Sequence, residues 1–517
     1  MARTLKRKLS RIVNLSRGYD VVEGFNARMR PRATIEYGGE DSSLPFWNRL
    51  NMIALARQGA RNGDTLRALM QQMRNNVIGT VAGKATFNFA DADLRKQVTR
   101  EFAKWARTAE FSDDLPLAMV LELIVDTKML GGDLVLVFDD GLVEDSGRIL
   151  AFEPDEIANV VKDWFAEKFP AGWTQRQGRI YNHNGRFMGV IVSHKYRGRG
   201  EFPRDENGVW FLTVDRNAAV QDWIMLREVW RFNQGRGVPP VAAPLDTLLD
   251  LESVTKYEVQ AALKNSQTLG QIVNTSPTGG DANGDEVPEA IDEETARAAG
   301  LDVSELQNGG AGGAECEELE LENLPDHGVV FDLMPDNVKM ELLDTKHPNA
   351  NMEAFIKWLG GRAGAALGLG KCYSTMEAST SYTAFRGEQV MTWPTFAKAQ
   401  KRLEREVLDW VVAKAVPWLA RHGRFDLARL PEDWAEGVRW AWPLMPEVDS
   451  KATFEANKIA LESGQKTLAD FCDDGDPEGF YDRLAKERDA LHARGLLSPL
   501  EKSVNGTVFN LKGNEKQ

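Results

Sequence analysis

The sequence predicts an α+β protein with several helical blocks and one mainly β block. Apolar residues recur at the spacing of one helix face in residues 44–78, 349–419 and 450–495. Residues 147–232 instead hold short runs of β-branched and aromatic residues separated by Gly, Asn and Asp, which is typical of strands joined by turns. Strands and helices do not alternate regularly along the chain, so a dinucleotide-binding fold is not expected.

Length and composition narrow the class of protein further. A chain of 517 residues has room for about three domains, and 43% hydrophobic residues are enough for a buried core. The net charge of −14 argues against a protein that coats nucleic acid, because tight phosphate binding needs clustered Lys and Arg. No apolar run approaches the ~18 residues of a membrane span, and no secretory signal is present, so we expect synthesis in the cytoplasm and no membrane partner.

The chain opens with a basic arm, residues 1–43. Its first 32 residues carry nine basic side chains against Asp20 and Glu23. The basic residues are Arg3, Lys6, Arg7, Lys8, Arg11, Arg17, Arg28, Arg30 and Arg32. Such a charge favours an acidic partner, and a solvated tail is the alternative.

Residues 44–243 predict one α+β body. Helical periodicity over 44–78 is interrupted near Gly63, with a fresh cap at Asp64. A short strand is expected at 85–89. Further helices are expected through 102–105 and 115–130.

Strands are predicted in the rest of this body. Leu134–Phe138 is a buried strand between acidic turns, and Arg179–Tyr181 and Met188–Val192 form a hairpin. Val209–Leu212 and Met225–Trp230 supply two more strands.

Composition changes abruptly in the middle of the chain. A helix is expected over 244–270, with Pro244 as its first residue. Within 271–348, the segment 281–322 carries fourteen Asp and Glu residues against one basic residue and is rich in glycine. Such a segment cannot bury enough apolar area to order itself alone, so we expect a loop that orders on a partner or stays mobile. Two strands are expected after it, at 328–333 and 338–343.

A helical hairpin over 349–419 is the most distinctive feature. Its first helix, 349–370, has an apolar stripe followed by small residues at Gly360, Gly361, Gly364, Ala365 and Gly368. Because glycine weakens an isolated helix by roughly 1 kcal/mol relative to alanine, we expect another backbone to approach closely here. Residues 371–382 are polar and without a period, which predicts a loop. An ordinary core helix pair with a serine-rich turn is the alternative interpretation.

The remaining elements follow in order. A second helix begins at 383, with a kink expected at Pro394 and an end near Pro417. Residues 434–442 predict a strand, and 450–495 predict helices with a break at Gly464. The polar tail 496–517 is expected to fray.

No motif for catalysis, a cofactor or a metal is present. The six histidines are scattered, and Cys316, Cys372 and Cys472 lie too far apart for a zinc or disulfide pattern. Gly370-Lys371 resembles the end of a phosphate loop, but Ala365 stands where that motif needs glycine, and Cys372 where it needs a hydroxyl. The sequence therefore predicts a protein that is not an enzyme.

Several segments, in this order and spacing, resemble the lambda-type family of portal proteins of tailed bacteriophages over about residues 45–495. They are Leu66–Gly79, Phe102–Trp105, Asn184–Arg186, Gln234–Pro239, Gly328–Pro335 and Ser381–Arg386. The resemblance implies a portal fold assembled as a dodecameric ring around a DNA channel at one capsid vertex.

The family architecture can be laid over the predicted blocks. The resemblance implies a wing at 44–243, stem helices at 244–270 and 349–370, an α/β clip at 271–348, a tunnel loop at 371–382, a tunnel helix and return to the wing at 383–449, and a helical crown at 450–495.

The resemblance also implies sites and partners. Lys371, Ser374, Thr375, Ser379 and Thr380 would face DNA without reading its sequence, and the small residues of 349–370 would pack in the ring. Implied partners are the terminase large subunit, head–tail adaptor proteins and the major capsid protein, in the virion. Two alternatives stay open. One is an oligomeric capsid protein without a channel, which would form closed shells, and the other is a nucleotide-driven translocase, which would hydrolyse ATP.

Overall fold

The computed structural model describes residues 44–80, 82–193, 208–232, 234–267, 271–274, 338–341, 351–377, 381–446, 450–465 and 477–495. The chain divides into two compact units, residues 1–253 with 353–517, and residues 254–352. The basic arm, the acidic segment 281–322, the predicted strand 328–333 and the C-terminal tail lie outside the described residues.

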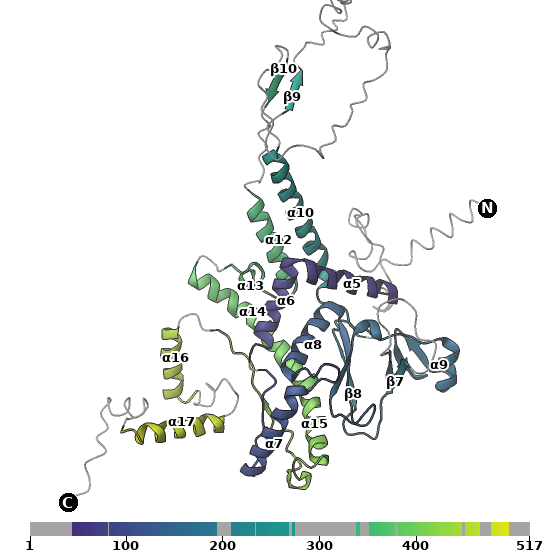
Figure 1. Ribbon diagram of the computed structural model, residues 1–517, viewed down its shortest axis with the longest axis vertical. Helices are drawn as coiled ribbons and strands as arrows, with labels where there is room; N and C mark the ends of the chain where they lie inside the picture. Colours follow the sequence, from purple (N-terminus) through teal and green to yellow (C-terminus); the bar gives the residue numbers. More distant parts are fainter. Residues whose placement is uncertain are drawn as a thin grey trace, which may run out of the picture. The chain divides into compact units, whose positions relative to one another are not determined.

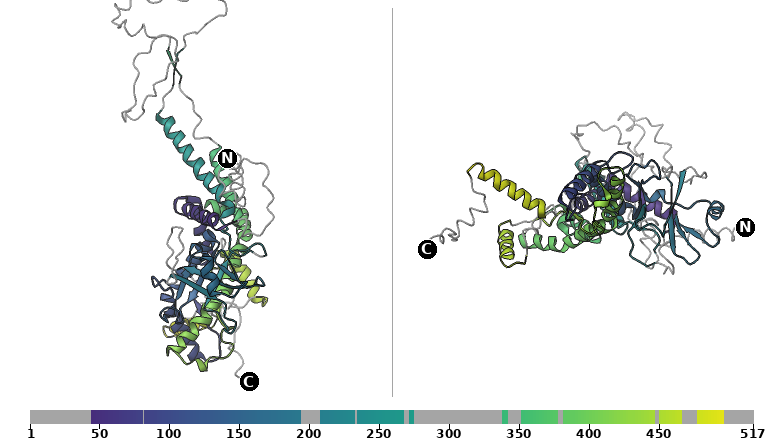
Figure 2. Two further views of the ribbon diagram at one scale, coloured as in Figure 1. Left: turned by 90° about the vertical axis from the view of Figure 1, so that its right-hand side faces the viewer. Right: turned by 90° about the horizontal axis from the view of Figure 1, so that it is seen from below.

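The first unit opens with four helices in the predicted order. They are α5 (Phe46–Asn62), α6 (Asp64–Val77), α7 (Ala92–Trp105) and α8 (Leu117–Gly131). The predicted break between α5 and α6 is confirmed, but Gly63 occupies the cap position, and Asp64 is the first residue of α6. Figure 1 shows α7 and α8 beside the strands β7 (Val209–Thr213) and β8 (Trp223–Arg227), with α5 above them, and Figure 2 gives two further views.

Two antiparallel sheets form the β part of this unit. One has the order β3 (Ile149–Phe152), β2 (Asp133–Phe138) and β8 (Trp223–Arg227). The other has the order β4 (Thr174–Arg176), β5 (Arg179–Tyr181), β6 (Phe187–Ser193) and β7 (Val209–Thr213). The predicted hairpin is confirmed as β5 and β6, with Arg179 opposite Val190. The mixture of helices and sheets confirms the α+β class.

Some predicted strands are shorter in the structure. β8 ends at Arg227, so the prediction that it reaches Trp230 is wrong. The buried Gln234 amide explains this end, because it accepts from the Trp230 N–H and donates to the Glu228 carbonyl. The regions 85–89 and 434–442 contribute only β1 (Ala85–Thr86) and β11 (Arg439–Trp440), which pair with each other. Helix α9 (Lys162–Lys168) was not predicted.

A fully buried ion pair joins the two sheets. The Arg236 guanidinium donates to both carboxylate oxygens of Asp133 at 2.6 and 2.9 Å. Its other donors bond the carbonyl oxygens of Pro154, Ile157 and Gln177. All five N–H donors of this side chain are therefore satisfied, which is the condition under which a buried arginine is tolerated.

The glycine beside this arginine is required by close backbone contact. A Cβ atom on Gly237 would lie 1.9 Å from the Gly132 carbonyl oxygen. Gly132 itself has a φ of +84°, a left-handed conformation that favours glycine. These contacts explain why position 237 in the Gln234–Pro239 segment is a glycine.

A long interrupted helix begins at Tyr382. It consists of α14 (Tyr382–Leu403), a π-helical turn (Glu404–Leu408) and α15 (Asp409–Arg421). A π turn absorbs one extra residue, which in a regular α-helix would rotate the residues after it by about 100°, so the buried faces of α14 and α15 both point into the core. Both prolines lie inside helices, so the prediction that the helix ends near Pro417 is wrong.

The main core is continuous through these helices and the first sheet. Aromatic rings form a chain across it, with Phe102 against Trp105 at 5.3 Å, Trp105 against Phe138 at 6.4 Å, and Phe138 against Trp410 at 6.4 Å. Helices α16 (Ser450–Glu462) and α17 (Pro477–His492) confirm helical structure near the C-terminus, and Gly464 follows α16 with a φ of +70°.

The second unit contains an antiparallel pair, β9 (Gln271–Asn274) and β10 (Val338–Glu341). The latter confirms the strand predicted near 338, whereas β9 was not predicted. Helix α10 (Ala242–Gln267) begins in the first unit, and Pro244 is its third residue rather than its first. Within the described ranges, no helix is both long and apolar enough to cross a membrane.

Candidate functional site

The polar segment after residue 370 begins with a short helix, α13 (Lys371–Thr375). This helix packs against the small residues of α12 (Met352–Ala366). A Cβ atom on Gly364 would lie 2.4 Å from the Ser374 Cβ, closer than side-chain carbons approach. The expectation that another segment comes close is thus confirmed at Gly364, where the approaching segment is α13 of the same chain, whereas Gly360 and Gly361 have only ordinary contacts at 3.9 and 3.7 Å.

Side chains of α14 hold the first turn of α13. The Thr392 hydroxyl accepts from the Gly370 N–H at 2.9 Å, and the Glu388 carboxylate accepts from the Cys372 N–H at 2.7 Å. Burial raises the pKa of the Cys372 thiol to about 12, and its hydrogen bond to Glu388 adds to the shift. The thiol therefore stays protonated at neutral pH and is not a nucleophile.

Both ends of the following segment are fixed. Met376 ends α13 in a left-handed conformation with a φ of +58°, which costs a non-glycine residue roughly 1 kcal/mol. Lys357 of α12 bonds Glu377 at 3.0 Å as well as Glu353 at 2.5 Å. At the other end, the Ser381 hydroxyl accepts from the Ala384 N–H and caps α14.

The structure corrects part of the predicted DNA-facing set. Residues 371–375 are helical, so the prediction of a loop over all of 371–382 is wrong. Ser374 is buried against Gly364, and its hydroxyl donates to the Lys371 carbonyl, so this side chain cannot face a channel. Lys371 is exposed and Thr375 is half-buried, and their contact with DNA stays a prediction. Ser379 and Thr380 lie outside the described residues.

The small residues between positions 360 and 368 divide into two groups. Gly360 and Gly364 are buried inside the unit. Gly361, Ala365 and Gly368 instead line an open hollow of about 760 Å³ between α12, α13 and α14. Ring packing through Gly360 and Gly364 is therefore not supported, whereas the hollow remains open to a partner.

We call this hollow the groove. Small residues line it together with Trp358 and Met391, which are 54% and 81% exposed. Arg362 lies over the Trp358 ring at 4.8 Å, and Lys371 lines the groove as well. It therefore combines an apolar interior with cations.

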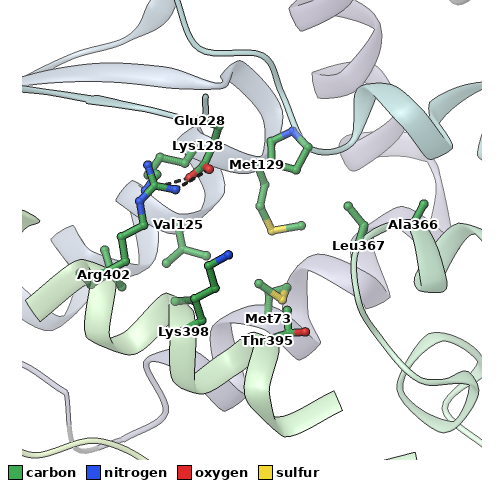
Figure 3. Close-up of a pocket in the computed structure, with 13 residues that line it drawn as sticks. Met73, Val125, Lys128, Met129, Glu228, Ala366, Leu367, Thr395, Lys398 and Arg402 are labelled. Carbon is green, nitrogen blue, oxygen red and sulfur yellow. Dashed lines mark hydrogen bonds and ion pairs between the residues drawn. The ribbon is translucent and has the colours of Figure 1, made fainter. Parts of the chain in front are cut away.

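A smaller cavity of about 270 Å³ lies beside it, between α6, α8, the end of α12 and α14 (Figure 3). Met73, Val125, Met129 and Leu367 give it an apolar lining. Ion pairs connect four charged side chains beside this cavity. Glu228 pairs with Lys128 at 2.9 Å and with Arg402 at 2.5 Å, and Glu406 pairs with Arg402 at 2.7 Å. This network ties α14 to α8 and to the end of β8.

Nucleotide binding at Gly370-Lys371 is disfavoured by this geometry. The backbone N–H groups of Gly370 and Cys372 are already bonded to α14, and the Glu388 carboxylate would repel a phosphate. Among the described residues, no cluster of three or more His, Cys, Asp or Glu side chains could hold a metal ion.

Sequence reasoning missed the residues that build this site. Glu388 and Thr392 reach α13 from 16 and 22 positions further along the chain, and a local pattern carries no signal for such a contact. Trp358 and Met391 could have been noticed as large apolar residues beside a small-residue stripe.

Comparison with known proteins places this chain in a family. A family model described as "Phage portal protein, lambda family" matches residues 27–400, well over half of the sequence and all of α12 and α13. The chain belongs to the lambda family of phage portal proteins. The resemblance read from the sequence is confirmed, and with it the portal fold class. This family is a structural one, in agreement with the absence of a catalytic motif in the sequence.

Individual relatives are more distant. A "Probable portal protein" of Halomonas phage phiHAP-1 is 21% identical over 477 residues, which cover 87% of this chain and 82% of that protein. A solved structure described as "Neck of native GTA particle computed with C12 symmetry" aligns with a TM-score of 0.44 at 9% identity, covering 81% of this chain and 90% of that one. "Neck of empty GTA particle computed with C6 symmetry" aligns with a TM-score of 0.43 at 10% identity and the same coverage.

Proposed function

We propose that this portal-family protein assembles into a dodecameric ring at one capsid vertex and that double-stranded DNA passes through the ring during packaging and ejection. The single observation that carries the proposal is the family match over residues 27–400. In this proposal the protein is made in the host cytoplasm and becomes part of the virion.

The proposed division of labour follows the predicted blocks. Residues 44–243 form the wing, α10 and α12 belong to the stem, 271–348 form the clip that docks the terminase large subunit and later the adaptor proteins, and 450–495 form a crown that meets the capsid interior. The separate compact unit 254–352 supports a docking module distinct from the wing.

The segment after α13 is proposed to touch the moving DNA. Glu388 and Thr392 hold the first turn of α13, and Lys357 pairs with Glu377 just after this helix. A chain with a net charge of −14 and isolated cations such as Lys371 suits this task, because each neutralised phosphate strengthens binding and slows sliding. Hydroxyls can contact a backbone without reading sequence.

Electron microscopy of the purified protein tests the ring. We expect rings with a central hole wide enough for a DNA duplex. Closed shells without such a hole would favour the alternative, an oligomeric capsid protein without a channel.

A charge substitution tests the DNA contact separately. Ser379→Asp with Thr380→Asp should leave rings intact but reduce the yield of DNA-filled heads, because carboxylates repel passing phosphates. Ser379→Asn with Thr380→Asn is the matched control of similar size and should package normally. Equal yields from both double variants would contradict the proposed contact.

A further inference from the structure

An exposed apolar knob follows β8. Val229, Trp230 and Phe232 are 46%, 68% and 102% exposed, although they lie within four consecutive residues. Large apolar side chains clustered on a surface are typical of an interaction site, and tryptophan is enriched among the residues that dominate binding energy. We call Val229, Trp230 and Phe232 the knob.

The base of the knob is rigid. The Gln234 side chain, 4% exposed, accepts from the Trp230 N–H at 3.1 Å and donates to the Glu228 carbonyl at 3.0 Å. The Glu228 carboxylate is bonded to Lys128 and Arg402. A rigid exposed element loses little conformational entropy on binding, so the knob is preorganised for a partner.

The groove of the same chain has the complementary character. Its small residues Gly361, Ala365 and Gly368 leave a volume of about 760 Å³, which gives room to aromatic rings. Trp358 and Met391 add exposed apolar surface, and the cations Arg362 and Lys371 also line it. Bulky aromatic rings on one surface thus match small residues and exposed apolar side chains on the other.

Knob and groove are separate surfaces that flank one cavity. They share no residue, yet Glu228 at the base of the knob lines the 270 Å³ cavity together with Ala366 and Leu367, which lie next to groove residues (Figure 3). A contact between two different surfaces of identical copies is head-to-tail, and such contacts form a ring when the rotation between copies closes and an open filament when it does not.

We infer that the knob of one copy inserts into the groove of the next copy of this chain. This inference rests on the proposed ring and adds the contact that joins neighbouring copies. Burying a Trp and a Phe side chain covers roughly 300–500 Å², about half of the ~800 Å² per partner in a stable interface. The Arg402–Glu228 ion pair then links each contact to α14, the helix that holds the proposed DNA-facing segment.

Photo-crosslinking in the assembled full-length protein tests the contact. A benzoylphenylalanine replaces Phe232, the protein is assembled from a mixture of light and heavy isotope-labelled chains, and irradiated products are mapped by mass spectrometry. We expect crosslinks between light and heavy chains at Met391 or within 354–371. Rings without such crosslinks, or with Phe232 linked to another segment or another protein, would overturn the inference.

Assembly measurements give a second, independent readout. Trp230→Ala with Phe232→Ala, and separately Ala365→Trp, which fills the groove, should raise the protein concentration needed for half-assembly at least tenfold in mass photometry. Leu142→Ala and Ala103→Trp are matched controls, since both residues are exposed elsewhere, and they should assemble as the unaltered protein does. Unchanged assembly of the knob and groove variants would contradict the inferred contact.

These outcomes separate the two proposals. An unaltered protein that stays monomeric contradicts the proposed function itself. Rings that form through other surfaces contradict only the knob-and-groove contact.

Discussion

The contact between α12 and α13 gives the sharpest prediction, because one glycine decides whether α13 can sit where it does. In the Gly364→Ala variant the added Cβ would lie 2.4 Å from the Ser374 Cβ and 2.9 Å from its Oγ. Gly360 is the matched control, since a Cβ there meets nothing nearer than the Thr375 Cγ2 at 3.9 Å. Both glycines are buried in the same helix, four residues apart.

The magnitude follows from two opposing effects. Alanine stabilises a helix by roughly 1 kcal/mol relative to glycine, and this gain is common to both variants. Overpacking in a filled site costs about 1–3 kcal/mol, and only Gly364→Ala incurs it. We therefore expect Gly360→Ala to stabilise the contact slightly and Gly364→Ala to be less stable than Gly360→Ala by about 1–3 kcal/mol.

Hydrogen exchange of the backbone N–H groups of α13 measures this local effect. Because 1.4 kcal/mol is a factor of ten, exchange within 371–375 should be about 5–150-fold faster in Gly364→Ala than in Gly360→Ala. Adding Ser374→Gly removes the clashing Cβ and Oγ atoms. This substitution should therefore lower the stability of the Gly364→Ala variant by less than it lowers the stability of the unaltered protein. Equal exchange in the two glycine variants, or no rescue by Ser374→Gly, would refute the packing argument.

Three further predictions concern stability. Arg236→Met should destabilise the protein to urea by about 3–5 kcal/mol, because it leaves the buried Asp133 charge unpaired. Burial raises the pKa of Asp126 to about 6, whereas the same carboxyl ionises near pH 4 in the unfolded chain, so the stability of the unaltered protein falls between pH 4 and pH 7. Asp126→Asn removes this ionisation and should therefore stabilise the protein progressively over the same range, by up to about 1–2 kcal/mol. Deleting Arg405 from the π turn should leave a regular α-helix with both buried faces still toward the core, and circular dichroism and thermal melting should show little change.

Each of these has a control or a contrary outcome. Arg429→Met breaks the exposed pair with Asp91 and should cost less than about 1 kcal/mol, so an equal loss from both arginine variants would contradict the role of burial. A pH-independent difference between Asp126→Asn and the unaltered protein would contradict the raised pKa. Deletion of the buried Val407 instead of Arg405 should be clearly more damaging, since it also removes a core side chain.

The sequence by itself determined the kind of protein and most of its regular elements. Periodicity located α5, α6, α8 and α12, because one buried face imposes a helical repeat on local sequence. It located the β5–β6 hairpin, whose turn residues are adjacent in the chain. The order of motifs such as Gln234–Pro239 and Ser381–Arg386 was enough to indicate the portal family.

Only the tertiary structure decided what the individual side chains do. Ser374 has the polar character of a surface residue, yet α13 buries it against Gly364. Trp230 has the character of a strand residue, yet Gln234 ends β8 before it and leaves the ring exposed. Ser374 meets Gly364 across two helices, whereas Gln234 lies four residues from Trp230 and acts only because the fold buries its amide. A residue's type fixes which contacts it can make, and the fold fixes which of them it does make.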